Sequence, residues 1–159
     1  MIFWQLNALH YLTFLNFDFH PCTDITLLNR LLHANYKEIS RWDMYQAEVE
    51  SGNLEWGVLH TEKFFKENCR LLEGKNDDFY LLKILINLLR SKDEDIAAIA
   101  CYDIGEFVRF YPNGKSIAIR LGAKAIVITL IEHDNLDLQR HALQCISKIM
   151  VQNWEYVNN

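Results

Sequence analysis

Residues that could do chemistry are common in this sequence, but their spacing matches no known site. The chain has six histidines and four cysteines, the side chains that most often bind zinc. It has no HExxH motif and no CxxC pair. His133 and His141 lie eight residues apart, with a predicted interhelical loop beginning between them. We interpret the histidines as surface or loop imidazoles and expect no metal site.

Motifs for nucleotide binding and nucleophilic catalysis are also missing from the sequence. No GxGxxG or P-loop string occurs, and the NGKS string at residues 113–116 lacks the upstream glycine and the strand of a P-loop. No GxSxG motif is present. The acidic residues 93–95 fit the start of a helix, where the helix dipole favours negative charge. We therefore predict no catalytic residue, no cofactor and no enzymatic activity.

The four cysteines are far apart in the sequence. A chain of 159 residues can bury a stable core without disulfides. We expect free, buried thiols in a reducing compartment, where disulfides are rare. The residues concerned are Cys22, Cys69, Cys101 and Cys145.

Composition favours one helical domain that does not bind nucleic acid and does not insert directly into a membrane. Half of the residues are apolar, and six glycines and two prolines are few for the many turns of an all-β fold. The net charge of −5, with cations scattered among acids, lacks the basic stripe of a nucleic-acid binder. Met1–Phe19 is apolar but interrupted by polar residues, so we expect no membrane insertion. We interpret it as a helix that packs on the rest of the domain or on chain outside this sequence.

The second half of the sequence, residues 77–159, repeats itself with a period of 42 residues. The shift places Ile84 on Ile126, Leu88 on Leu130, Asp95 on Asp137, Ala100 on Ala142 and Ile104 on Ile146. A period near 40 residues is typical of HEAT and armadillo repeats. We therefore predict an all-α, armadillo/HEAT-like helical repeat (an α-solenoid), with two repeats in this half. Ile104 and Ile146 are expected to be equally buried in it.

Helical periodicity, capping residues and breakers predict where the elements lie. Residues 1–76 are expected to form N-terminal helices, at 1–17 and from about 24 to 39, and an irregular aromatic segment, Leu54–Leu59, of the same domain. Trp56, Phe64 and Phe65 are expected in the core, although an exposed Trp56 would instead be a binding anchor. Residues 91–94 have capping-box spacing. The other predicted helices are Arg41–Val49, Thr61–Cys69, Phe79–Arg90, Asp95–Tyr111, Lys115–Leu121, Ala123–Glu132 and Asp137–Gln152.

Four strings of the sequence, in order and in register, resemble one family. They are SGNLEWGVLHTEKFFKEN (51–68), LLKILINLLRSKD (81–93), DIGEFVRFYPNGK (103–115) and NWEY (153–156). The chain is similar over roughly residues 9–156 to the C-terminal domain of the H subunit of V-type proton-pumping ATPases. It departs from the family at Gly57-Val58, Phe65 and Asn113. It also lacks the long N-terminal superhelix, which indicates a fragment, an unusual gene product or a truncated gene model.

The resemblance implies a non-catalytic regulatory subunit of the vacuolar-type ATPase. Such a subunit couples ATP hydrolysis to proton translocation and inhibits hydrolysis by the detached ATPase sector. The implied partners are the peripheral stalk, the catalytic head and rotor, and the cytosolic part of the large membrane-sector subunit. The implied location is the cytoplasmic face of vacuolar and endosomal membranes, or the cytosol when detached.

The surface around Pro112 is our candidate partner site. Arg109, Tyr111, Lys115 and Arg120 supply its polar and aromatic contacts, because arginine and tyrosine often anchor interfaces. The structural alternative is that Tyr111 caps the helix end and Arg109 pairs with Glu106. If charge reversal at Arg109 and Lys115 leaves partner binding unchanged, the contacts should lie around residues 55–60 instead.

An armadillo adaptor that binds an extended peptide is the alternative function. Such adaptors often carry an asparagine ladder on the third helix of each repeat. The surface where that ladder would lie here has Asp103, Glu106 and Arg109 instead.

Overall fold

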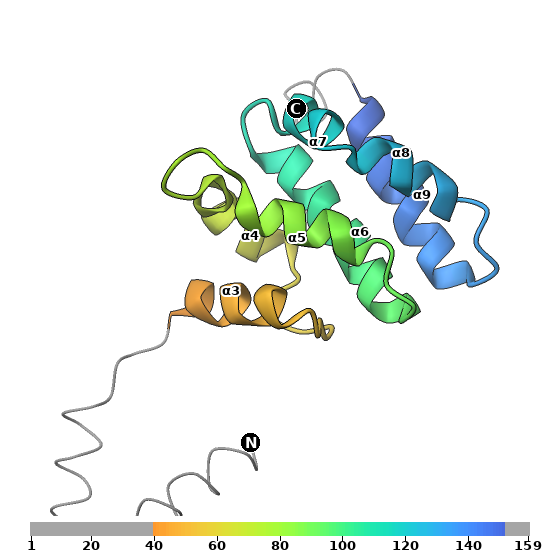
Figure 1. Cartoon of the computed structure of the whole chain (residues 1–159), viewed down its shortest axis with the longest axis horizontal. Coiled ribbons are helices and arrows are strands. Elements are labelled where there is room, and N and C mark those ends of the chain that lie inside the picture. Colours follow the sequence, from red (N-terminus) through yellow and green to blue (C-terminus); the bar gives the residue numbers. More distant parts are fainter. Residues whose placement is uncertain (1–39, 152–159) are drawn as a thin grey trace, which may run out of the picture. The chain divides into compact units, whose positions relative to one another are not determined.

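The computed structural model describes residues 40–151, and every regular element in that range is a helix (Figure 1). The predicted all-α class is confirmed, and the arrangement is that of an α-solenoid. The helices predicted within residues 1–39 lie outside the described residues. The elements are α3 (Arg41–Ser51), α4 (Glu62–Asn68), the 3-10 helix η1 (Cys69–Glu73), α5 (Tyr80–Leu88), α6 (Glu94–Phe110), α7 (Gly114–Arg120), α8 (Ala123–Leu130) and α9 (Leu136–Met150).

Local sequence signals set the ends of the first helices. Ser40 and Asp43 form a capping box at the start of α3, and Gly52 ends that helix with a left-handed backbone at φ 75°. The Thr61 side chain accepts a hydrogen bond from the Phe64 amide at the start of α4. Residues 54–59 form a loop, as predicted from their irregular pattern.

Caps recur with the 42-residue period. The Asp93 carboxylate accepts hydrogen bonds from the backbone amides of residues 95 and 96 at the start of α6. Asn135, 42 positions later, accepts from the amides of residues 137 and 138 at the start of α9. The expected capping box over 91–94 is wrong, because Asp93 is the cap and Ser91 accepts from the Asp93 amide instead.

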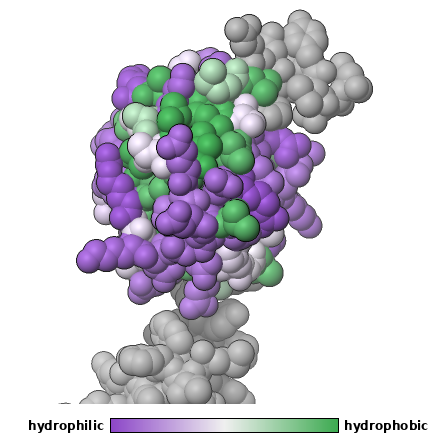
Figure 2. Space-filling model, turned by 90° about the vertical axis from the view of Figure 1, so that its right-hand side faces the viewer, coloured by the Kyte–Doolittle hydropathy of each residue, from purple (hydrophilic) through white to green (hydrophobic). Residues whose placement is uncertain are grey.

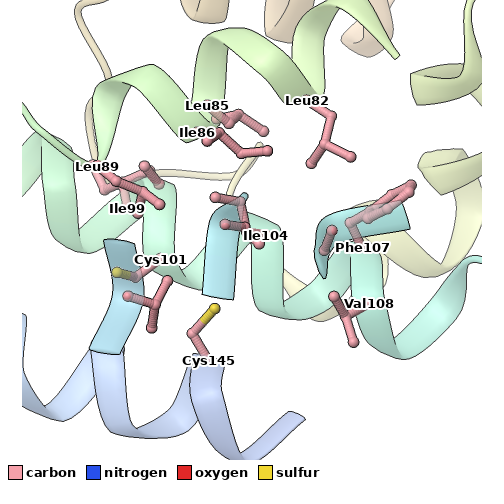
Figure 3. Close-up of a cluster of buried hydrophobic side chains, with 14 of the residues drawn as sticks. Leu82, Leu85, Ile86, Leu89, Ile99, Cys101, Ile104, Phe107, Val108 and Cys145 are labelled. Atoms are coloured by element: carbon pink, nitrogen blue, oxygen red, sulfur yellow. The ribbon is translucent and has the colours of Figure 1, made fainter. Parts of the chain in front are cut away.

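Helix α6 lies at the centre of the described core and contacts α4, α5, α7 and α9. In Figure 3, leucine and isoleucine side chains of α5 point toward those of α6, and Cys145 of α9 approaches α6 from the other side. Many apolar side chains of α5 and α6 are therefore fully buried, but only some of their counterparts one period later are. The counterpart pairs that are both buried include Leu85 with Val127, Ala100 with Ala142, and Phe107 with Ile149.

Small residues let α6 and α9 approach closely. A Cβ atom on Gly105 would lie 3.0 Å from the Cδ atom of Lys148 and 3.5 Å from the Cα atom of Cys145. Ala97, Ala98 and Ala142 are also buried. A Cβ atom at position 105 would require the Lys148 side chain to shift, and longer side chains would have to fit beside the α9 backbone, so a small residue here suits the close contact.

Two burial predictions are wrong. Ile104 is fully buried, but its counterpart Ile146 is only partly buried. Among the described helices, α9 packs against α6, α7 and α8, and its opposite face carries exposed side chains. Phe64 and Phe65 are buried as expected, whereas Trp56 is 44% exposed. The predicted division at residues 76 and 77 stays a proposal.

Candidate functional site

The candidate site around Pro112 lies where α6 ends and α7 begins. Arg109 does not extend into solvent, because its Nη1 atom lies 3.1 Å from Oε2 of Glu62 and 3.8 Å from Oε2 of Glu106. Its guanidinium also lies over the Phe110 ring, 4.9 Å from the centroid. Arg109 therefore links α6 to α4 through Glu62. Its second contact, with Glu106, is the pairing that the structural alternative predicted.

The other three residues of this site have contacts in different directions. The Tyr111 ring stacks on Phe107 at a centroid distance of 4.9 Å and meets Phe79 edge-on. The pKa of Tyr111 is raised to about 12, chiefly by burial and secondly by a hydrogen bond to Glu73. The Nζ atom of Lys115 lies 3.5 Å from the Val151 carbonyl oxygen, and Arg120 is exposed. These side chains share a segment, but their contacts do not converge on one pocket.

A separate, buried polar network has members from three parts of the sequence. Asp103 of α6 is fully buried and accepts a hydrogen bond of 2.9 Å from the Tyr45 hydroxyl. The Nδ1 atom of His60 lies 2.9 Å from Oδ2 of Asp103, and its Nε2 atom lies 3.0 Å from Oε1 of Glu48. The same Glu48 oxygen accepts from the backbone amide of Glu55.

The electrostatics of this network favour an ion pair. Burial acts to lower the pKa of His60, but hydrogen bonds and charges from Asp103 and Glu48 raise it to about 9. Burial raises the pKa of Asp103, whereas its hydrogen bonds with His60 and Tyr45 lower it. Because the Tyr45 hydroxyl and the His60 Nδ1 atom both lie at donor distance from the Asp103 side chain, we assign a protonated imidazole paired with a carboxylate. Asp103 is 0% exposed and His60 is 4% exposed, so neither faces a substrate. The network ties the loop of residues 54–60 to the centre of α6 rather than offering a general base.

A second buried carboxylate joins the two repeats. Glu106 is 2% exposed and forms an ion pair with Lys148 of α9. The expectation that Asp103 and Glu106 lie on a surface is wrong. The available signal was their position on α6, where Ala100 and Phe107 at helical spacing are core residues.

Trp56 stands on the rim of a surface groove of about 360 Å³. Its ring packs against His141 at a centroid distance of 4.9 Å and against Tyr102 at 5.7 Å. Met44 and Val58, which also line the groove, are 48% and 64% exposed. An exposed tryptophan beside apolar side chains is typical of a binding anchor, the second of the two interpretations offered by the sequence.

The described residues contain no cluster of histidine, cysteine and carboxylate side chains that could hold a metal ion. Cys69, Cys101 and Cys145 are free and buried, and burial raises the pKa of Cys101 to about 12. Cys22 lies outside the described range. None of the helices between residues 40 and 151 is long and apolar enough to cross a membrane.

Comparison with known proteins gives a consistent set of relatives. A family model described as the V-ATPase H subunit matches residues 38–154. The chain is 43% identical over 136 residues to a V-type proton ATPase H subunit of Drosophila melanogaster, covering 84% of this chain and 29% of the relative. It is 40% identical over 136 residues to a probable V-type proton ATPase H subunit, number 2, of Caenorhabditis elegans, covering 84% and 28%.

A more distant relative agrees with these two. A probable V-type proton ATPase H subunit of Oryza sativa subsp. japonica is 31% identical over 137 residues, covering 81% of this chain and 30% of the relative. The chain thus spans less than a third of the length of these curated relatives. The family model covers all the described helices. The chain belongs to the H-subunit family of V-type ATPases.

Proposed function

We propose that this chain is a non-catalytic regulatory part of a V-type proton ATPase and acts by binding other subunits of that enzyme. The observation that carries the proposal is the family match over residues 38–154. The roles proposed are coupling of ATP hydrolysis to proton translocation and inhibition of hydrolysis by the detached ATPase sector. The proposed location is peripheral, on the cytoplasmic face of vacuolar and endosomal membranes, or the cytosol when detached.

The arrangement of polar groups supports a binding function. The buried carboxylates Asp103 and Glu106 pair with His60 and Lys148 and stabilise the stack. Exposed apolar side chains instead gather in grooves, as around Trp56. The partners proposed are the peripheral stalk, the catalytic head and rotor, and the cytosolic part of the large membrane-sector subunit. A rigid helical surface suits partners that are exchanged without folding or unfolding.

Two surfaces are proposed for these contacts. The first is the segment around Pro112, where exposed Arg120 and half-buried Tyr111 and Lys115 offer cationic and aromatic groups. Arg109 belongs to this set, but its ion pairs with Glu62 and Glu106 also hold the fold. The second surface is the Trp56 groove.

The test is to add the purified chain to detached ATPase sector that lacks its own H subunit and to measure ATP hydrolysis. We expect hydrolysis to fall with increasing concentration of the chain. The double variant Lys115→Glu with Arg120→Glu, and the single variant Trp56→Ala, should each weaken inhibition about tenfold or more. Arg109 is left intact, because reversing its charge would leave the buried Glu106 without that cation.

The matched control reverses two exposed cations that belong to neither proposed surface, Lys83→Glu with Arg90→Glu. It should inhibit like the unmodified chain. Unchanged hydrolysis at saturating, folded chain would contradict the inhibitory role. Full inhibition by both test variants would instead show that the contacts lie elsewhere.

A further inference from the structure

The Trp56 groove combines exposed apolar side chains with two carboxylates. Trp56, Met44 and Val58 line it and are 44%, 48% and 64% exposed. The carboxylates in the lining are those of Glu48 and Glu55, and none of the described lysines or arginines lines the groove. Apolar contact area and negative charge therefore lie side by side on this surface.

The charge of Glu48 is only partly balanced, because one imidazolium serves two carboxylates. The Nδ1 atom of His60 lies 2.9 Å from Oδ2 of Asp103, and its Nε2 atom lies 3.0 Å from Oε1 of Glu48. These three groups together carry one negative charge, and transfer of the proton from His60 to Asp103 would leave that sum unchanged. The Glu48 side chain is 19% exposed and that of Asp103 is 0% exposed, so the excess charge meets solvent at the groove.

Neighbouring cations do not remove this excess. Residues 40–60 hold four carboxylates, whereas their cations are Arg41 and the protonated His60. Arg41 donates a hydrogen bond of 3.0 Å to the Val58 carbonyl oxygen and offsets one carboxylate at most. Glu55 is exposed, and its carboxylate has no ion pair or hydrogen bond within residues 40–151. The surface around the groove is therefore net negative.

Charge distinguishes this groove from the other exposed apolar surface. Hydrophobic residues also gather at the end of the molecule formed by α8 and α9 (Figure 2). The two cations that line the groove there, Arg140 and Lys148, already pair with Asp137 and Glu106. Charge selects no occupant at that surface, whereas at the Trp56 groove it selects a cationic one.

We propose that the Trp56 groove binds a short segment of a partner protein in which a large apolar side chain is flanked by lysine or arginine. The apolar side chain packs on the exposed part of Trp56, beside Met44 and Val58. The flanking cations reach Glu48 and Glu55. Burial of the tryptophan supplies affinity, and the charges supply selectivity. The inference rests on the proposed function, in which this groove is one of two contact surfaces, and adds the chemistry of the partner.

The test uses three fluorescent peptides of about 10 residues, which reach roughly 30 Å when extended. The first has leucine and phenylalanine at its centre, flanked by lysines. The second replaces the lysines with glutamates, and the third keeps the lysines but replaces the apolar residues with serines. The third controls for general attraction to a chain of net charge −5. In fluorescence anisotropy with the full chain, the first peptide should bind at least about tenfold more tightly than either of the others.

Variants with matched controls localise the binding. Trp56→Ala should weaken the first peptide about tenfold or more, whereas Tyr80→Ala, at an aromatic residue of α5 that is 52% exposed, should not. Glu55→Gln should weaken it about threefold, and Glu67→Gln, the same charge change at an exposed residue of α4, should not. Val58→Lys should bind it at least about threefold more weakly than Val58→Glu, because both variants lose the valine but differ in charge. Circular dichroism checks that each variant is folded.

Several results would overturn the proposal. Equal binding of the lysine and glutamate peptides removes the cationic segment as the occupant, and equal weakening by Glu55→Gln and Glu67→Gln assigns the binding to net charge alone. Binding that appears only after residues 1–39 are deleted assigns the groove to the chain's own start. Self-association that Trp56→Ala abolishes, measured by sedimentation, assigns it to a second copy.

The peptide assay and the hydrolysis assay can fail independently. If the first peptide binds as expected but the chain does not inhibit ATP hydrolysis, the inhibitory role fails and the chemistry of the groove is confirmed. If Trp56→Ala relieves inhibition but the peptides show no preference for lysine, the proposed function stands and this inference fails.

Discussion

The helix pairs α5–α6 and α8–α9 are related by the 42-residue period, and the second helix of each pair has the same N-cap geometry. The two pairs nevertheless differ in how far their side chains are buried. Helix α6 is covered by α4, α5, α7 and α9, and its side chain at position 104 is fully buried. In α9, position 146 is only partly buried, and leucines at 136 and 143 are exposed. Equivalent residues in a repeat stack therefore have different energetic roles, because burial depends on the neighbours on both sides.

The largest difference between the pairs is expected at positions 103 and 145, which are equivalent by the period. Asp103→Ala leaves the His60 imidazole buried without its carboxylate and should lower the free energy of unfolding by about 3–5 kcal/mol. Cys145→Ala removes only a sulfur atom and should cost about 1 kcal/mol. Urea unfolding of both variants measures these values. Equal losses would mean that the buried ion pair does not stabilise the first repeat.

Positions 104 and 146 test burial without charge. Ile104→Ala should cost about 2–5 kcal/mol, since it leaves a cavity in a close-packed core. Ile146→Ala should cost about 1 kcal/mol, because its side chain already contacts solvent. Thermal or urea denaturation distinguishes the two. A loss at 146 as large as that at 104 would imply that α9 is covered in solution.

The pH dependence of stability should also differ between the pairs. Since the pKa of His60 is raised to about 9 in the folded chain, its contribution is complete below pH 6.5 and is lost as the pH rises through 9. The loss is about 2 kcal/mol after allowing for solvent around Glu48. Burial lowers the pKa of His141 in α9, so its contribution is instead lost as the pH falls below its ordinary value.

Urea unfolding curves recorded from about pH 5, below the ordinary pKa of histidine, to about pH 10, above the raised pKa of His60, measure both slopes. His60→Gln should remove the loss on the alkaline side, and His141→Gln should remove the loss on the acid side. An alkaline loss that persists in His60→Gln would contradict the ion pair assigned to this residue.

The smallest effects are expected at the caps, and there the two pairs should agree. Asp93→Ala and Asn135→Ala each remove a side chain that accepts two backbone hydrogen bonds, so each should cost about 1 kcal/mol. Capping is local and does not depend on position in the stack. A difference well above about 0.5 kcal/mol, beyond ordinary deviations between independent sites, would show that one cap also holds the repeats together.

Much of the fold could be predicted because its signals are local. Helix ends within residues 40–151 fall within two residues of the predicted ones, since caps and apolar spacing act over one or two turns. The site could not be predicted in the same way. The buried Asp103 side chain pairs with His60, 43 residues away in the sequence, and the buried Glu106 side chain pairs with Lys148, 42 residues away. The 42-residue period makes Lys148 the counterpart of Glu106, but it does not indicate that the two side chains meet, and it does not relate His60 to Asp103.

Trp56 illustrates the same limit. Its size predicts core packing, but its surroundings are His141 and Tyr102, which lie far from it in the sequence. The predicted contacts Arg109, Tyr111, Lys115 and Arg120 stay proposals, because their value depends on a partner surface. Sequence patterns predicted the scaffold more completely than its exposed side chains.

The thiols of Cys101 and Cys145 lie in the two helices whose contact holds the repeats together. Both are buried, and burial raises the pKa of each thiol, so very little reactive thiolate is present at neutral pH. Alkylation at these positions therefore requires α6 and α9 to separate. The rate of alkylation, followed by mass spectrometry of each cysteine, therefore reports how often the contact between α6 and α9 opens.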